Sequence, residues 1–364
     1  MKKYLFPLLF ILLMKPISLN ACTAFCLYDD EQILVAKNLD WPIGDGLVLI
    51  NKSGVEKSAF TDREKKLRWT SQYGSVTFNQ FGKEFPLGGM NEAGLVIEEL
   101  NLFGKGPQHD SLFALNEFQW VQYHLDNYAT VDEIIESGPF VAVVPILLNL
   151  HYFITDSRGA VAIIEFYDSQ VYIYKNNDVP YPVLSNNTYE NSLKYLRNFR
   201  GFGGDLPIRR ETTSGERFVR TAASLKEFEV SGKTPRVKTA FAILDSVRQD
   251  DTRWSIVYDI RNKQIHFHTA QNTGTRIVDI EAFDFTCETQ SRYFNILSPD
   301  TGYISTLFRP LAPQRNTDLV MEVCSQYRAI DPGNVTGERF LGMAEYGNGI
   351  GCGPVRSYKK LNHE

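Results

Sequence analysis

The sequence has little of several features that would assign it to other classes of protein. Its 38 lysines and arginines are interleaved with 43 acidic residues and form no basic stripe, so we expect no nucleic-acid partner. After residue 21 no apolar run approaches about 18 residues, so we expect no stable membrane insertion. No linker rich in Pro, Gly or Ser interrupts the chain. This favours a single domain over 22–364, of which 270–364 is the part least defined by pattern.

Motifs for several other chemistries are also missing. There is no Gly-x-Ser-x-Gly elbow of a serine hydrolase, and Gly201-Phe-Gly-Gly204 is not followed by the Lys-Ser/Thr of a phosphate loop. His266 and His268 alternate on one predicted strand, but no third ligand follows at a recognisable spacing, which favours core or surface histidines. We therefore expect neither a metal nor a cofactor.

Cysteine is scarce, with five residues, and the number is odd. If Cys26, Cys287, Cys324 and Cys352 form up to two disulfides, Cys22 is left over as a free thiol. The four could equally be free and buried, and the sequence does not give their connectivity.

The first 21 residues predict a cleavable secretion signal. Lys2 and Lys3 form a basic start, and Leu5 to Met14 is an apolar stretch that is too short to span a bilayer. Cleavage after Ala21 would leave Cys22 as the new N-terminus. The protein is thus expected to be secreted or periplasmic.

An N-terminal cysteine carries a thiol and a free α-amine on one residue. Their pKa values lie near ~8.5 and ~7.7 in model compounds, so one residue can supply both a nucleophile and a base. This indicates an N-terminal nucleophile hydrolase. Two alternatives remain at this point: Leu19-Asn-Ala-Cys22 loosely matches a lipoprotein box, which predicts a non-enzymatic envelope protein lipidated at Cys22, and Cys22 could instead form a disulfide with Cys26.

Predicted strands and helices occur in blocks, which favours an α+β layered architecture over a doubly wound parallel sheet. β-Branched and aromatic enrichment predicts strands over 23–28, 33–37, 47–51, 75–81, 95–100, 153–155, 161–167, 171–174, 254–260 and 264–269. Helical spacing of apolar residues predicts helices over 114–125, 131–136, 191–200, 216–228 and 239–247, with Thr130 as a cap.

Several motifs, in order, resemble the choloylglycine hydrolase and penicillin V acylase family. They are Cys22-Thr-Ala-Phe, Ala36-Lys-Asn-Leu-Asp-Trp41, Met90-Asn-Glu-Ala-Gly-Leu95 with Glu99-Leu-Asn101, Leu184-Ser-Asn-Asn187, Glu216-Arg-Phe-Val-Arg220, and the hairpin from Trp254 to Thr269. The resemblance implies a four-layer αββα N-terminal nucleophile fold and hydrolysis of linear amides. It also implies the catalytic residues Cys22, Asp40, Asn101, Asn186, Arg217 and Lys37.

The roles implied for these residues follow from their chemistry. Cys22 attacks the amide carbonyl and forms a thioester, while Asp40 fixes the α-amine beside it. Asn101 and Asn186 match positions that hold the oxyanion and the surroundings of the nucleophile, and Arg217 orients Asp40 or the cysteine.

Lys37 stands where the family commonly has arginine. A lysine lowers a neighbouring thiol pKa as a point charge but lacks the planar fork of donors. The departure leaves open whether lysine fills the same role or belongs to a subgroup with different substrates.

The expected partner is a small N-acyl amide. We rank amides of the penicillin V or N-acyl homoserine lactone type above conjugated bile salts, because an exported enzyme meets extracellular small molecules. Candidate walls of an apolar acyl pocket are Phe60, Trp69, Phe78, Phe81, Phe85 and Phe140. Many relatives form tetramers, which makes a homo-oligomer an open expectation.

Overall fold

The computed structural model describes residues 22–102, 104, 113–137, 141–330 and 336–352. The predicted signal peptide at 1–21, and Phe140 among the candidate pocket walls, lie outside the described residues.

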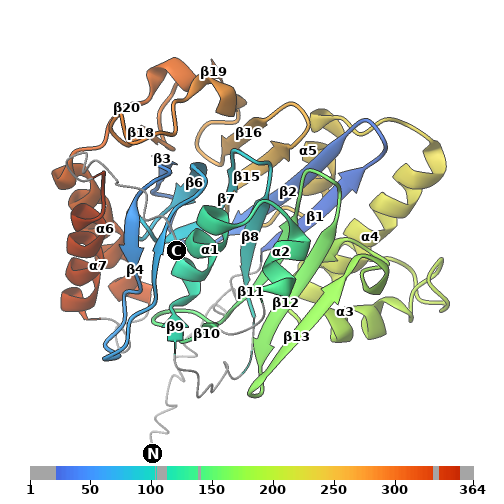
Figure 1. The fold of residues 1–364 in the computed structure, drawn as a ribbon. Coiled ribbons are helices and arrows are strands. Elements are labelled where there is room, and N and C mark those ends of the chain that lie inside the picture. The colour runs from blue at the N-terminus through green and yellow to red at the C-terminus, as the bar shows by residue number, and fades with distance from the viewer. Residues whose placement is uncertain (1–21, 103, 105–112, 138–140, 331–335, 353–364) are drawn as a thin grey trace, which may run out of the picture.

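Two β-sheets form the centre of the molecule (Figure 1). The first contains, in spatial order, β14 (Val183–Leu184), β1 (Thr23–Tyr28), β2 (Ile33–Asp40), β15 (Thr252–Asp259), β16 (Gln264–Thr269), β17 (Arg276–Asp279) and β19 (Gly302–Tyr303). The second contains β13 (Gln170–Lys175), β12 (Val161–Tyr167), β11 (Leu150–Thr155), β8 (Val96–Asn101), β7 (Pro86–Asn91), β6 (Ser75–Asn79), β3 (Leu47–Asn51), β18 (Arg292–Asn295) and β20 (Arg309–Pro310). Two short ladders pair β4 (Glu56–Ser58) with β5 (Arg68–Thr70) and β9 (Phe113–Leu115) with β10 (Val141–Val143).

Helices cover the outer face of each sheet. The first sheet is covered by α4 (Ser214–Ser231), which contacts β1 and β14, and by α5 (Val237–Ser246), which contacts β2 and β15; α3 (Tyr189–Leu196) packs on α4. The second sheet is covered by α1 (Glu117–Asn127), which contacts β7 and β8 and is followed by α2 (Val131–Glu136). The αββα layering expected from the resemblance is thereby confirmed.

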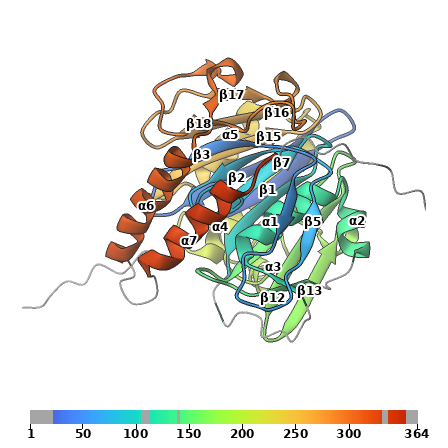
Figure 2. The same ribbon diagram turned by 60° about the vertical axis from the view of Figure 1, so that its left-hand side comes forward.

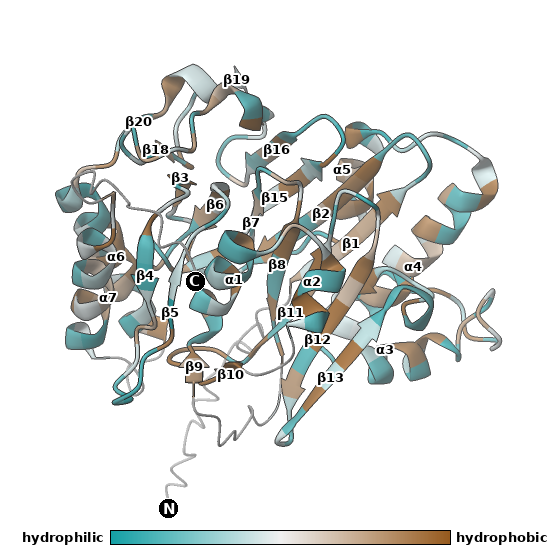
Figure 3. Cartoon of the chain, in the orientation of Figure 1, coloured by the Kyte–Doolittle hydropathy of each residue, from teal (hydrophilic) through white to brown (hydrophobic). Residues whose placement is uncertain are grey.

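Strands between two layers must be buried on both faces, and the sequence shows this as runs without polar alternation. Every residue of β2 is buried, including Lys37, Asn38 and Asp40. Figure 3 shows apolar colour along much of β1 and β12, whereas α6 and α7 carry much hydrophilic colour. Polar groups inside such strands therefore need partners within the protein.

Local signals explain several helix starts. Asn116 caps α1 by accepting from the backbone N–H groups of Phe118 and Gln119. Thr130 caps α2 in a capping box with Glu133, as the sequence predicted.

The C-terminal part, which the sequence pattern defines least, packs against the same hydrophobic core. Helices α6 (Pro313–Ile330) and α7 (Gly337–Gly349) lie side by side at one end of the second sheet (Figure 2). Tyr327 and Phe340 pack on Phe81, with ring centroids 6.4 and 6.0 Å away. The two helices thus form a wall near β6.

One disulfide joins Cys287 to Cys352, while Cys22, Cys26 and Cys324 are free and buried. Among the described residues no helix has the length and apolar character needed to cross a bilayer, and no cluster of three or more His, Cys, Asp or Glu side chains is arranged to hold a metal ion.

Candidate active site

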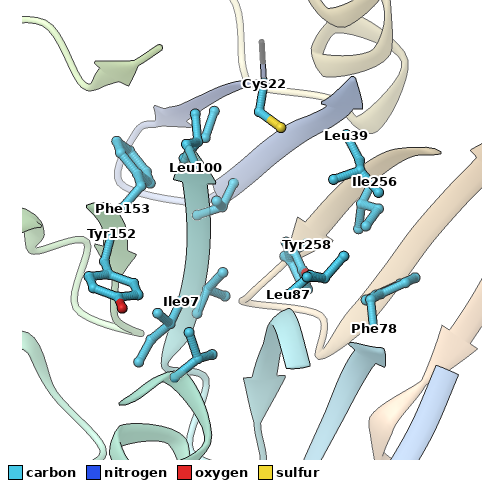
Figure 4. Close-up of a cluster of buried hydrophobic side chains, with 14 of the residues drawn as sticks. Cys22, Leu39, Phe78, Leu87, Ile97, Leu100, Tyr152, Phe153, Ile256 and Tyr258 are labelled. Carbon is cyan, nitrogen blue, oxygen red and sulfur yellow. The ribbon is translucent and has the colours of Figure 1, made fainter. Parts of the chain in front are cut away.

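Cys22 lies immediately before β1 and is buried, with its side chain 5% exposed. Figure 4 shows its sulfur at the edge of the apolar cluster between the sheets, directed toward the side of Leu39. Cys22 lines a narrow pocket with Asp40 from the end of β2 and Asn101 from the end of β8. The pocket therefore receives polar groups from both sheets.

Arg217 on α4 fastens the backbone at the cysteine. Its Nη1 donates to the carbonyl oxygen of Cys22 at 2.6 Å and to the hydroxyl of Thr23. The same nitrogen is 3.9 Å from a carboxylate oxygen of Asp40. Arg217 is fully buried, so these contacts replace its hydration. The sequence-based role of Arg217, orienting Asp40 or the cysteine, fits this geometry at both residues.

Asn186 connects Arg217 to Asn101. Its Oδ1 accepts from Nη2 of Arg217 at 3.0 Å, and its Nδ2 donates to the backbone oxygen of Asn101 at 2.7 Å. Ser214, the first residue of α4, accepts the backbone N–H of Asn186 at 2.9 Å. The side chain of Asn186 is thus committed to protein partners on both sides, while Asn101 lines the pocket beside Cys22.

Asp40 is held by donors from the loop before β15 and from that strand. Gln249 Nε2 donates to Oδ2 at 2.7 Å, and the hydroxyl of Thr252 donates to Oδ1. Burial raises the pKa of Asp40 to about 6, and the charge of Arg217 and these hydrogen bonds work against that rise. The hydrogen bonds therefore fix the orientation of the carboxylate, and its pKa lies close to neutral pH.

Burial disfavours the thiolate form of Cys22. Burial raises its pKa to about 12; the charge of Lys37 and the backbone N–H of Asp40 lower it, while the charges of Asp40 and Glu99 raise it further. A cysteine with such a pKa is almost entirely in the thiol form at neutral pH. Its activation requires an additional base or cation.

Lys37 makes a buried ion cluster between the two sheets. Its Nζ lies 2.7 Å from Oε2 of Glu98 and 3.6 Å from Oε1 of Glu99, and it donates to the carbonyl oxygen of Leu87 at 3.2 Å. Burial lowers the pKa of Lys37, but the two glutamates outweigh it, so the net shift is upward. Lys37 therefore stays protonated at neutral pH, and its positive charge acts on Cys22.

The geometry around Glu98 depends on a neighbouring glycine and a tyrosine. The hydroxyl of Tyr258 on β15 donates to Oε1 of Glu98. A Cβ at Gly88 would lie 2.2 Å from Oε2 of Glu98, so only glycine leaves room for this carboxylate. Lys37 and Tyr258 belong to one sheet and Glu98 to the other, and the polar cluster links them.

The Cys22 pocket has mostly apolar walls and a volume of about 20 Å³; the apolar side chains are Leu39, Trp41, Phe81, Leu87 and Leu148. Of the predicted aromatic walls that the structure describes, Phe81 alone borders this pocket. A larger pocket of about 770 Å³, lined by Phe60 among others, contains none of the predicted catalytic residues. We place the candidate site at the smaller pocket, because the polar groups gather there.

The structure brings the six residues predicted from the sequence together around Cys22. Cys22, Asp40 and Asn101 line the pocket. Arg217 on α4 and Asn186, two residues after β14, support it, and the charge of Lys37 acts on the cysteine. Sequence reasoning missed Glu98, Glu99, Gln249 and Thr252. The signal for the glutamates was two adjacent acids inside an otherwise apolar strand, Val96-Ile-Glu-Glu-Leu100.

Comparison with known proteins identifies the family. A sequence model of the linear amide C–N hydrolases, choloylglycine hydrolase family, matches residues 22–293, so this match begins at Cys22. Penicillin V acylase from Pectobacterium atrosepticum is 27% identical in an alignment 344 positions long, which covers 80% of this chain and 91% of that protein.

Solved structures give the same fold. Penicillin V acylase from Agrobacterium tumefaciens superposes with a TM-score of 0.70 at 25% identity, covering 80% of this chain and 98% of that one. A conjugated bile acid hydrolase variant from Clostridium perfringens has a TM-score of 0.63 at 18% identity, covering 75% and 97%, which supports the fold alone. Because the family model covers most of the chain, the protein belongs to the choloylglycine hydrolase family and is a hydrolase of linear amide C–N bonds.

Proposed function

We propose that the active enzyme begins at Cys22 and that its thiol is the nucleophile. The observation that carries this is the environment of Cys22, whose carbonyl oxygen is held by Arg217 while its side chain shares a pocket with Asp40 and Asn101. The family match that begins at residue 22 supports the same boundary. Cleavage after Ala21 converts the peptide nitrogen of Cys22 into an amine.

The new α-amine supplies what the buried thiol lacks. It accepts the thiol proton as the sulfur attacks the amide carbonyl, and the tetrahedral intermediate then collapses to a thioester. The amine passes that proton to the leaving nitrogen. The amide is thereby split into an acyl group on Cys22 and a free amine, and water later hydrolyses the thioester.

The surrounding charges divide into two groups. Lys37 favours the thiolate from beneath, and Asp40, anchored by Thr252 and Gln249, lies where it can hold the amine in one orientation. Asn101 is a neutral polar side chain that lines the pocket from the other sheet, in reach of a developing oxyanion. Lysine fills the role that arginine usually has in the family.

The proposed substrates are N-acyl amides of the penicillin V or N-acyl homoserine lactone type, ranked above conjugated bile salts. Leu39, Trp41 and Leu87 beside Cys22 offer apolar contacts to an acyl group, which must extend beyond this pocket of about 20 Å³. Two relatives at 25–27% identity are penicillin V acylases, which supports this order. Export through residues 1–21 would place the enzyme in the periplasm or outside the cell.

A matched pair of cysteine variants tests the nucleophile. Cys22 and Cys26 are both free and buried at the start of the chain, but only Cys22 lines the pocket. We expect Cys22→Ala to abolish hydrolysis across a panel of penicillin V, acyl homoserine lactones and bile salts, while Cys26→Ala keeps it within about twofold of the wild type.

Intact mass and N-terminal sequencing of the exported protein test the processing. A free Cys22 is the expected result, whereas diacylglycerol on Cys22 would replace the enzyme mechanism with a lipid anchor. Turnover by correctly processed Cys22→Ala would overturn the proposed nucleophile, and a preference for bile salts would overturn the substrate order.

A further inference from the structure

Glu99 is a carboxyl group in the wall of the nucleophile's own pocket. It lies on β8 two residues before Asn101, is 4% exposed, and lines the pocket together with Cys22 and Asn101. The proposed mechanism gives it no role. A buried carboxyl in a pocket with mostly apolar walls is costly and calls for a function.

The nearby cation is already engaged. Lys37 forms its short contact with Glu98 at 2.7 Å, whereas Oε1 of Glu99 is 3.6 Å away, beyond ordinary hydrogen-bond length. The cluster thus has two carboxyl groups for one ammonium. Glu98 is the partner of Lys37, and Glu99 is left with the weaker contact and a pocket in front of it.

The surroundings of Glu99 bring its pKa close to the value that a general base needs. Burial raises the pKa of Glu99 to about 7; Lys37 opposes this, and the charges of Glu98 and Glu117 add to it. A general base works best when its pKa is near the operating pH. Glu99 therefore exchanges a proton readily at neutral pH, unlike an ordinary surface glutamate.

The pocket beside Glu99 has room for a water molecule. Its volume is about 20 Å³, and a cavity holds a water from roughly 10–15 Å³ upward if two or more polar groups surround it. Glu99, Asn101, Asp40 and the Cys22 thiol supply polar groups around that volume. A water in this cavity is next to the sulfur that carries the acyl group in the proposed mechanism.

We propose that Glu99 is the general base that activates the water for hydrolysis of the Cys22 thioester. This inference rests on the proposed function and adds a residue to it. The water oxygen attacks the thioester carbonyl while one of its protons passes to the Glu99 carboxylate. The C–S bond then breaks, the thiolate leaves, and Glu99 returns the proton to sulfur as the carboxylic acid product departs and ionises.

The two half-reactions then use different bases. The α-amine of Cys22 serves acylation, in which a proton must travel from sulfur to the leaving nitrogen. Glu99 serves deacylation, in which the proton comes from a water on the pocket side. A change at Glu99 should therefore slow the second half-reaction and leave the first one intact.

The test is Glu99→Gln in the processed enzyme, with penicillin V as the substrate. Because kcat/KM reports acylation and kcat reports the slower half-reaction, we expect kcat to fall by about 100-fold and kcat/KM to stay within about threefold. Intact mass after rapid quenching should show acyl-enzyme accumulating on Cys22. Hydroxylamine, which attacks a thioester without a base, should restore turnover in the variant.

Two further variants separate this role from a structural one. Glu98→Gln loosens Lys37, so its kcat and kcat/KM should fall together; the same split as in Glu99→Gln would overturn the assignment. Glu165→Gln removes another fully buried carboxyl, one that pairs with His151 outside the pocket, and should leave both constants within about twofold.

Failure of this inference differs from failure of the proposed function. Equal losses in kcat and kcat/KM for Glu99→Gln, or no loss in either, would remove Glu99 as the base while the wild type still forms an acyl-enzyme. Absence of acyl-Cys22 in the wild type and in every variant, with turnover intact, would instead remove the cysteine mechanism itself.

Discussion

The Arg217 guanidinium donates to the backbone carbonyl oxygen of Cys22 at 2.6 Å, from a helix that covers the outer face of the sheet. The contact fixes the main chain of the nucleophile, not its sulfur. Positioning of that kind is worth a great deal in catalysis, since a displacement of about 1 Å can cost about 100-fold in rate.

Removing this contact should therefore affect activity more than stability alone would explain. We expect Arg217→Met to lower kcat/KM by about 100-fold. Arg220→Met is the control, because Arg220 lies on the same helix but donates to the carbonyl oxygens of Arg209 and Glu211 at the surface. The two variants are compared at a temperature at which both are fully folded. Similar losses of kcat/KM in both would show that activity depends on the helix as a whole and not on the contact with Cys22.

Lys37→Met should destabilise the protein in a pH-dependent way. The change leaves Glu98 and Glu99 buried without their cation, which costs about 3–5 kcal/mol when such a pair is broken. The loss should be largest near pH 8 and smaller near pH 5, where the two carboxyls take up protons and need no partner. Urea unfolding at both pH values measures it, and a loss of equal size at both would contradict the electrostatic origin. Adding Glu98→Gln to Lys37→Met should recover part of the stability.

Gly88→Ala should disturb the same cluster through volume alone. The added methyl would meet Oε2 of Glu98 at 2.2 Å, and overpacking of a buried site costs about 1–3 kcal/mol. Gly349→Ala is the control, since a Cβ there meets no atom within 4 Å among the described residues. Thermal unfolding should separate the two variants, and equal melting temperatures would rule out the steric account.

Glu99→Gln should change the pH dependence of stability as well as kinetics. Glu99 has a pKa of about 7 in the fold, above the 4.5 usual for a glutamate, so the native state binds its proton more tightly than the unfolded state does. Its contribution is therefore favourable at low pH and is lost as pH rises from 4.5 through 7. We expect Glu99→Gln to gain on the order of 3 kcal/mol relative to the wild type between pH 4.5 and pH 8. Denaturant unfolding at both ends measures the gain, and parallel curves for the two proteins would refute the raised pKa.

Reduction of the Cys287–Cys352 disulfide should loosen the C-terminal helices. The two cysteines are 65 residues apart in sequence, and a bridge over a long loop contributes about 2–4 kcal/mol. We expect Cys287→Ser to lower the melting temperature, and a reductant to lower that of the wild type by a similar amount but leave the variant unchanged. A reductant effect on the variant would point to another bridge.

The sequence predicted most of the regular elements because their patterns are local. The strands at 23–28, 47–51, 161–167 and 264–269 and the helix at 131–136 have the predicted bounds, since turn residues and the Thr130 cap mark their ends. The helix predicted from residue 114 begins at Glu117, because Asn116 caps it and β9 occupies the residues before. The predicted strand end at Lys37 extends to Asp40, because pairing with β15 continues to that residue.

The sequence predicted only those site residues that belong to a family motif. The family resemblance named Cys22, Asp40, Asn101, Asn186, Arg217 and Lys37, and the structure brings them together. It did not indicate that Lys37 is buried against two glutamates, because that ion cluster is made by residues from strands far apart in sequence. Thr252 and Gln249, which donate hydrogen bonds to Asp40, were not predicted for the same reason, since only sheet pairing brings β15 beside β2.

The Lys37–Glu98 pair also bears on how the molecule assembles. Apolar contact between two sheets has no preferred direction, whereas an ammonium held by a carboxylate and a carbonyl fixes one register. Cys22 approaches the pocket from one sheet and Asn101 from the other, so neither sheet holds the site alone. During refolding, the return of catalysis should therefore mark the docking of the two sheets.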